Sequence, residues 1–282
     1  MKGLAVVALA SCIVVASARA GSFDDFNRGI SASNLGDADA AIQYLTAALA
    51  GGDLALSMQA VAHLDRGIAY ARLKRTREAI ADITAAIALN PKLIDAYILR
   101  ATLTAQDGHL DQALQDCATL AGLGPPSSAT IAMCGRFDWQ AGRFDEAAAN
   151  FERSARLDAH ARGVGKIYDL LWAKLSRLKA RTADDPEFKE DVRALGTDDW
   201  PRPILEFLLG ASTLEAVNAA AAKGDAGAQV NQNCEVGFYV GEWQLLQGNE
   251  PAAKALLQRA VNTCPKAFIE LDPAMAELKT IK

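Results

Sequence analysis

A spacing of 34 residues recurs between Val61 and Ala159 of this 282-residue chain. A small residue opens each block, at Gly67, Ala101 and Gly135. An alanine follows twelve residues later, and a residue of the kind found in cores comes four positions after that. These landmarks are Ala79, Ala113 and Ala147, then Ile83, Cys117 and Phe151, with blocks that close at Pro91, Pro125 and Ala159. A fixed period of this length indicates an array of similar helical units.

A 34-residue period with small residues at these places is typical of tetratricopeptide (TPR) repeats, each a pair of antiparallel helices. The pattern predicts four N-terminal repeats, over about 22–53, 60–93, 94–127 and 128–161. The first is looser and is followed by a four-residue insertion near Gly51-Gly52-Asp53. Abundant alanine, with only 6% aromatic residues, suits helices whose backbones pack closely.

The pattern fades from Arg162, because Asp169 and Arg181 occupy the places of the small residues. It returns with Gly241 and Ala253, in a repeat from Cys234 to Ala267, and a last helix over about 274–280 would cover the end of the array. The predicted fold is therefore all-α, a TPR helical-hairpin solenoid. Its predicted parts are a signal peptide (1–20), four repeats (22–161), an irregular helical segment (162–233), and a C-terminal repeat with its capping helix (234–282).

The N-terminus has the features of an export signal. Lys2 precedes an apolar run from Gly3 to Val15, and Ala18-Arg19-Ala20 predicts cleavage after Ala20. A second interpretation stays open, because Leu9-Ala10-Ser11-Cys12 resembles a lipobox that would place a lipid on Cys12. The chain is thus expected to be exported to the periplasm, with anchoring to the membrane through Cys12, or secretion, as alternatives.

Four cysteines remain after such a cleavage, an even number that favours disulfides in an oxidising compartment. Cys234 opens the first helix of the predicted last repeat and Cys264 ends the second, and these ends are neighbours in an antiparallel hairpin. We therefore predict a Cys234–Cys264 bridge. Cys117 and Cys134 lie on adjacent predicted helices, where either a second bridge or two ordinary buried thiols fits.

Composition and motifs argue against several functions. Removal of residues 1–20 changes the net charge from −5 to −7, and an acidic chain lacks the basic face that nucleic acid requires. No HExxH, CxxC or GxSxG motif occurs among its residues. Acids at helix starts explain the aspartate pairs at 184–185 and 198–199 better than a cation site does. The prediction is a non-catalytic protein without a metal or cofactor.

Function would then lie in a binding surface. The first helices of TPR hairpins line a groove that suits an extended or helical peptide. Its predicted lining is Ile68, Arg72, Thr102, Gln106, Arg136, Trp139 and Gln140. For Trp139 two alternatives stay open: it is exposed in the groove, or it is buried under the neighbouring repeat or the irregular segment.

The order of export signal, repeats, irregular middle and final repeat resembles that of the NlpI-type proteins of the bacterial cell envelope. Trp200 with Ile204-Leu205-Glu206-Phe207-Leu208-Leu209-Gly210 carries the resemblance. So does Phe238-Tyr239-Val240-Gly241, followed by Leu245-Leu246-Gln247-Gly248-Asn249. The resemblance implies an adaptor that binds periplasmic proteases and peptidoglycan hydrolases, often as a homodimer; the best-known members are lipoproteins.

The leading hypothesis is a scaffold that recruits such envelope enzymes. One alternative is a structural component of a secretion or outer-membrane assembly. Another is an enzyme with an unrecognised site in 162–233, which a cleft with clustered polar groups and shifted pKa values would mark.

Overall fold

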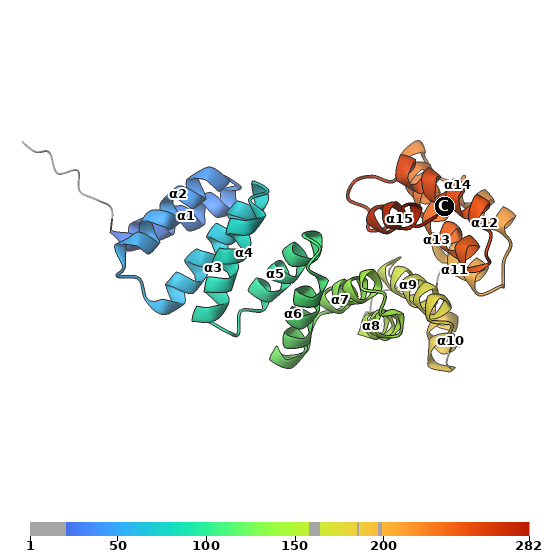
Figure 1. Cartoon of the computed structure of the whole chain (residues 1–282), viewed down its shortest axis with the longest axis horizontal. Coiled ribbons are helices and arrows are strands. Elements are labelled where there is room, and N and C mark those ends of the chain that lie inside the picture. The colour runs from blue at the N-terminus through green and yellow to red at the C-terminus, as the bar shows by residue number, and fades with distance from the viewer. Residues whose placement is uncertain (1–20, 158–163, 185, 197–198, 282) are drawn as a thin grey trace, which may run out of the picture. The chain divides into compact units, whose positions relative to one another are not determined.

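The computed structural model describes residues 21–157, 164–184, 186–196 and 199–281, and within these ranges it contains helices and turns but no strand (Figure 1). The predicted signal peptide and its cleavage site, together with Cys12, lie outside the described residues. No helix within these ranges is long and apolar enough to cross a bilayer.

Four hairpins come first, as the spacing predicts. They are α1 (Ser22–Leu35) with α2 (Ala38–Gly51), α3 (Leu56–Arg72) with α4 (Thr76–Leu89), α5 (Ile94–Gln106) with α6 (Leu110–Leu123), and α7 (Ser128–Gln140) with α8 (Phe144–Leu157). The middle holds α9 (Val164–Ala180), α10 (Pro186–Arg193), α11 (Arg202–Leu208) and α12 (Leu214–Ala221). The chain ends with the hairpin of α13 (Ala226–Leu246) and α14 (Glu250–Thr263), then α15 (Leu271–Leu278).

The small residues of the period allow the two helices of a hairpin to touch. A Cβ built on Gly67 would lie 2.9 Å from Cγ1 of Ile83, and one on Gly241 would lie 2.9 Å from Cγ of Leu257. A larger residue at either glycine would have to displace the facing side chain. Ala79 and its repeat equivalents are fully buried for the same reason. The sequence landmarks are thus the contact points of the hairpins.

The turn between the helices of each hairpin also follows the period. A residue with positive φ lies seven positions after each opening small residue: Gly36, Lys74, Gly108, Gly142 and Gly248. Glycine adopts this left-handed conformation without a steric penalty. Lys74, at φ 58°, is the one non-glycine in this series.

By its contacts, the described chain divides into two compact units, one up to Leu99 and one from Arg100. The boundary falls within α5. The first unit has an alanine-rich core, in which Leu45 and Ile83 are fully buried. Beside this core, the buried Asp82 accepts a hydrogen bond from Nε of Arg66 at 2.6 Å.

The second unit repeats that buried ion pair 34 residues later, where Nη2 of Arg100 donates to Oδ1 of Asp116 at 2.7 Å. Its main core is different, because it is built on large aromatic side chains. Trp172, Phe151, Phe238 and Tyr239 are all buried there. The irregular middle joins the same core through Ile204, Leu205 and Leu208 of α11.

Two helices differ from their expected bounds. The first helix of the last hairpin begins at Ala226, eight residues before the predicted repeat, because the side chain of Asp225 caps it by accepting from the Ala228 amide at 2.8 Å. The last helix runs over Leu271–Leu278 and not over 274–280. The predicted division into domains stays a prediction.

Candidate protein-binding surface

Helices α7, α9 and α13 of the second unit contact one another through their side chains. Tyr168 contacts Glu235, Trp172 contacts Tyr239, and Lys179 contacts Glu242. These contacts follow the same order along both helices, so α9 and α13 run parallel. Trp139 on α7 continues the row, with its ring 5.2 Å from that of Trp172. We call the surface that these three helices share the inner face.

The middle of the inner face is a closed aromatic layer. Trp139 is only 6% exposed and packs edge-on against Trp172. The centroid of the Phe144 ring lies 5.0 Å from that of the Trp139 ring. Of the two alternatives for Trp139, the structure therefore has the buried one. It belongs to the core and offers a partner almost no surface.

A buried charge network borders one end of this layer. The ammonium of Lys179 lies 2.8 Å from Oε2 of Glu242 and also contacts Glu277. It lies 4.9 Å from the centroid of the Trp139 ring, a cation–π contact. Burial raises the pKa of Glu242 to about 7, although Lys179 acts in the opposite direction.

A polar cluster borders the other end. Glu235 accepts hydrogen bonds from the Tyr168 hydroxyl at 2.7 Å and from the Trp200 indole at 2.5 Å. Tyr239 donates to Glu270, at the start of α15, at 2.9 Å. Both glutamates are only 3% exposed, and burial raises the pKa of Glu235 to about 7 and that of Glu270 above its usual range.

Arg136, on α7, lies near this cluster. Burial lowers the pKa of its guanidinium, and the negative charges of Asp169 and Glu270 act in the opposite direction. The side chain is half-buried. Among the described residues, no direct hydrogen bond or ion pair reaches this guanidinium. An arginine in this state has five donors ready for a carboxylate or carbonyl of another molecule.

A family model of the tetratricopeptide repeat matches residues 60–93, the block that the spacing assigns to the second repeat. A relative described as a lipoprotein NlpI homolog, from Haemophilus influenzae, is 25% identical over 244 residues, covering 86% of this chain and 76% of the relative. The chain carries a tetratricopeptide repeat and resembles NlpI. This combination supports a protein-binding adaptor role.

Two solved structures show the same fold. A tetratricopeptide repeat protein from Parabacteroides merdae has a TM-score of 0.58 at 18% identity, covering 92% of this chain and 97% of that one. The C-terminal part of a TPR repeat-containing protein from Cytophaga hutchinsonii has a TM-score of 0.53 at 12% identity, covering 89% and 87%. Both likenesses concern the fold alone.

The predicted groove residues of this TPR protein are divided between the two units. In the first unit, Ile68 is half-buried, and exposed Arg72 donates from Nη1 to the Ser33 carbonyl at 2.8 Å. In the second unit, Gln106 and Gln140 are exposed and Thr102 is half-buried. Arg136, Trp139 and Gln140 share α7, and of these Arg136 and Gln140 have surface to offer.

The acids and the tyrosine near Arg136 were not predicted from the sequence. One signal was present, because Asp169 occupies a place where the repeat expects a small residue. In the structure Asp169 accepts a hydrogen bond from the Ser154 hydroxyl at 2.6 Å, next to Arg136. The misfit therefore marks a polar site on the inner face. Glu235, Tyr239 and Glu270 had no such signal, because they meet only through tertiary packing.

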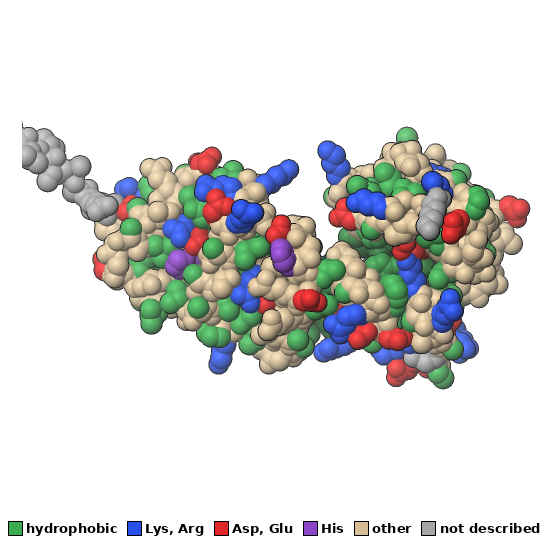
Figure 2. All heavy atoms as spheres, viewed as in Figure 1, with side chains coloured by type: hydrophobic (Ala, Val, Ile, Leu, Met, Phe, Trp, Pro, Cys, Tyr) green, Lys and Arg blue, Asp and Glu red, His purple; other side chains and the backbone are tan. Residues whose placement is uncertain are grey.

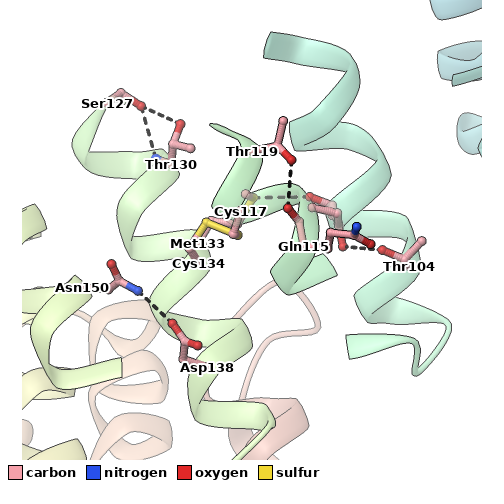
Figure 3. Close-up of a disulfide and its surroundings, with 12 residues drawn as sticks. Thr104, Gln115, Cys117, Thr119, Ser127, Thr130, Met133, Cys134, Asp138 and Asn150 are labelled. Carbon is pink, nitrogen blue, oxygen red and sulfur yellow. Dashed lines mark hydrogen bonds between the residues drawn. A yellow bond between two sulfur atoms is a disulfide. The ribbon is translucent and has the colours of Figure 1, made fainter. Parts of the chain in front are cut away.

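The cysteine sulfurs lie in two pairs at bonding distance, 2.03 Å for Cys234 and Cys264 and 2.06 Å for Cys117 and Cys134 (Figure 3). The first pair ties α13 to the end of α14. The second ties α6 to α7, two neighbouring repeats. Oxidation of these cysteines in the exported protein stays a prediction.

Other ligands find little support here. No group of three histidine, cysteine or acidic side chains that could hold a metal ion occurs among the described residues. Acidic and basic side chains are intermixed on the face drawn in Figure 2, and the described part of that face shows no continuous basic stripe.

Proposed function

We propose that this TPR protein is a non-catalytic adaptor of the bacterial cell envelope that holds a peptide segment of a periplasmic protein at Arg136 and Gln140, the accessible residues of its inner face. Proteases and peptidoglycan hydrolases are the partners that the resemblance to NlpI favours. Export to the periplasm, with or without a lipid on Cys12, belongs to the same proposal, and so does a homodimer.

The observation that carries the proposal is the state of Arg136. Its side chain is half-buried, so a partner's carboxylate would meet a smaller desolvation penalty than at an open surface. Charge-assisted bonds to arginine are stronger than neutral ones, and they fix orientation. Exposed Gln140, one turn along the helix, offers amide groups to the main chain of the same peptide.

The polar cluster favours binding over catalysis. Clustered acids with raised pKa values are the mark expected of a hidden enzyme site. Here, however, tyrosine and tryptophan donors already occupy the carboxylates of Glu235 and Glu270, which are nearly closed to solvent. A substrate would have to displace these bonds before it reached either carboxylate.

The test is recovery of partners from periplasmic extract on the immobilised protein. We expect Arg136→Gln to lower the recovery of a specific partner at least fivefold, and Arg136→Lys to restore part of it. Arg193→Gln, on the exposed end of α10, is the matched control and should change nothing. Thermal unfolding of each variant checks that it is folded.

Equal recovery with Arg136→Gln would remove the inner face from the proposal. Recovery of cytosolic partners alone would remove the assignment to the envelope. Sedimentation of the purified protein tests the homodimer separately, since a monomer at micromolar concentration would contradict it.

A further inference from the structure

A pocket of about 260 Å³ lies between α6, α7 and α8 in the second unit. Each helix lines it with one stripe of side chains. From α6 come Leu114, Ala118 and Ala121, from α7 come Thr130, Ile131 and Asp138, and from α8 come Glu146, Asn150 and Arg153. Cys117 and Cys134 lie in its wall, where they link the first two helices (Figure 3).

This pocket is distinct from the inner face. An α-helix turns about 100° per residue, so residues two positions apart point to nearly opposite sides. Cys134 and Asp138 line the pocket, and Arg136 lies midway between them in the sequence. Arg136 therefore faces away from the pocket, and the two surfaces can be occupied at once.

Most of the charges around the pocket are already paired. Asp138 accepts a hydrogen bond from the Asn150 amide at 2.8 Å (Figure 3) and lies 3.4 Å from Nε of Arg143. Arg143 also contacts Glu146 at 3.2 Å. Burial raises the pKa of Asp138, while Arg143 lowers it.

Arg153 differs from these residues. It is exposed at the pocket, and no hydrogen bond or ion pair to it is found within the described ranges. Because the other charges at the pocket are paired, the guanidinium of Arg153 is the positive charge available to a ligand. The chemical complement is a carboxylate next to an apolar group.

We propose that this pocket binds the C-terminal residue of a second polypeptide, with its apolar side chain among Leu114, Ala118 and Ile131 and its carboxylate on Arg153. A volume near 260 Å³ is below the 300–1,000 Å³ usual for drug-sized ligands, so it suits a single side chain. A C-terminal residue is the smallest peptide unit that presents an apolar side chain and a carboxylate together. The site gives the adaptor a second attachment point, independent of the proposed inner-face partner.

The probe is acetyl-Gly-Gly-Leu with a free carboxylate, titrated at millimolar concentration into the full mature protein and followed by amide chemical shifts. We expect saturable shifts confined to α6, α7 and α8. The matched C-terminal amide and acetyl-Gly-Gly-Ser should each bind at least fivefold more weakly. The amide tests the contribution of the carboxylate, and the serine peptide tests that of the apolar side chain.

Two variants test the site itself. Arg153→Gln should weaken the leucine acid at least fivefold, whereas Arg193→Gln should leave its affinity unchanged. Ala118→Leu should abolish binding, because the added side chain fills the pocket. Shifts on the inner face, an amide that binds as tightly as the acid, or no saturable shift would each overturn the proposal. Arg136→Gln should not alter this titration, so its outcome is separate from that of the partner recovery.

Discussion

Glu242 is a fully buried carboxylate on α13, and its environment links the stability of the fold to pH. Burial raises its pKa to about 7, and Glu277 adds to the rise while Lys179 opposes it. A carboxyl group whose pKa is higher in the folded state stabilises the fold when protonated. That contribution is complete below the ordinary pKa near 4.5 and disappears as the pH rises through 7.

We predict that Glu242→Gln flattens the fall in stability between pH 5 and pH 8. The wild type should lose on the order of 3 kcal/mol through this group, since each pKa unit corresponds to about 1.4 kcal/mol. The variant keeps an oxygen for Lys179 and has no titrating group. Urea unfolding at several pH values measures the difference, and equal slopes in the two proteins would contradict the prediction.

Trp139 gives a second test at a single position. We predict that Trp139→Ala lowers the free energy of unfolding by about 3–5 kcal/mol, because it opens a cavity beside Trp172 in a closed aromatic layer. Gln140→Ala, on the exposed next position, should stay within about 0.5 kcal/mol. Denaturant titration compares the two, and similar values would show that Trp139 is exposed in solution.

At the level of elements, the close contact between α13 and α14 depends on a glycine, Gly237. A Cβ on Gly237 of α13 would lie 2.8 Å from both the Ala260 nitrogen and the Leu256 oxygen of α14. These are backbone atoms, so relief requires the two helices to separate. This hairpin also carries Cys234 and Cys264, so the distance between α13 and α14 also sets how close these two cysteines lie.

We expect Gly237→Ala to destabilise the protein by about 1–3 kcal/mol through overpacking. Gly122, inside α6, is the matched control, because a Cβ there meets nothing within 4 Å. Gly122→Ala should stabilise by up to about 1 kcal/mol through helix propensity. Thermal melts of both variants give the signs, and a Gly237→Ala variant as stable as the wild type would show that the α13–α14 contact is loose.

The link between α13 and α14 supplies another prediction. Replacing Cys234 and Cys264 together by serine should lower the free energy of unfolding by about 3 kcal/mol, because a bridge across 30 residues restricts the unfolded chain. Reductant should lower the stability of the wild type and leave the double variant less affected. Mass mapping of the exported protein under non-reducing conditions is the direct check, and four free thiols there would contradict both bridges.

For the whole molecule, the predicted export would determine whether those bridges form and which partners the protein meets. We predict that the protein recovered from the envelope begins at Gly21 and carries a net charge of −7, since cleavage removes Lys2 and Arg19 but no acid. Intact mass measurement tests this. A lipid-modified Cys12 at the N-terminus would replace this interpretation with membrane anchoring, and an uncleaved Met1 would reject both.

The repeats were predictable because their signal is local. Gly67, Ala79 and Ile83 recur at one period in the sequence, and the structure uses these positions as the contacts within a hairpin. The irregular middle was less predictable, because α11 and α12 follow no period and are placed by packing onto the aromatic core. Some of its helices could be predicted from the sequence. The hydrogen bond from Trp200, just before α11, to Glu235 could not.

The sequence alone determined the all-α TPR hairpins, since helix period, small residues and turn glycines act within about 34 residues of one another. Tertiary structure decided the binding surface. It buried Trp139, brought Asp169, Tyr239 and Glu270 close to Arg136, and left Arg153 at a pocket on another side. Exposure and pKa depend on neighbours from distant parts of the chain, and a one-dimensional pattern does not contain those neighbours.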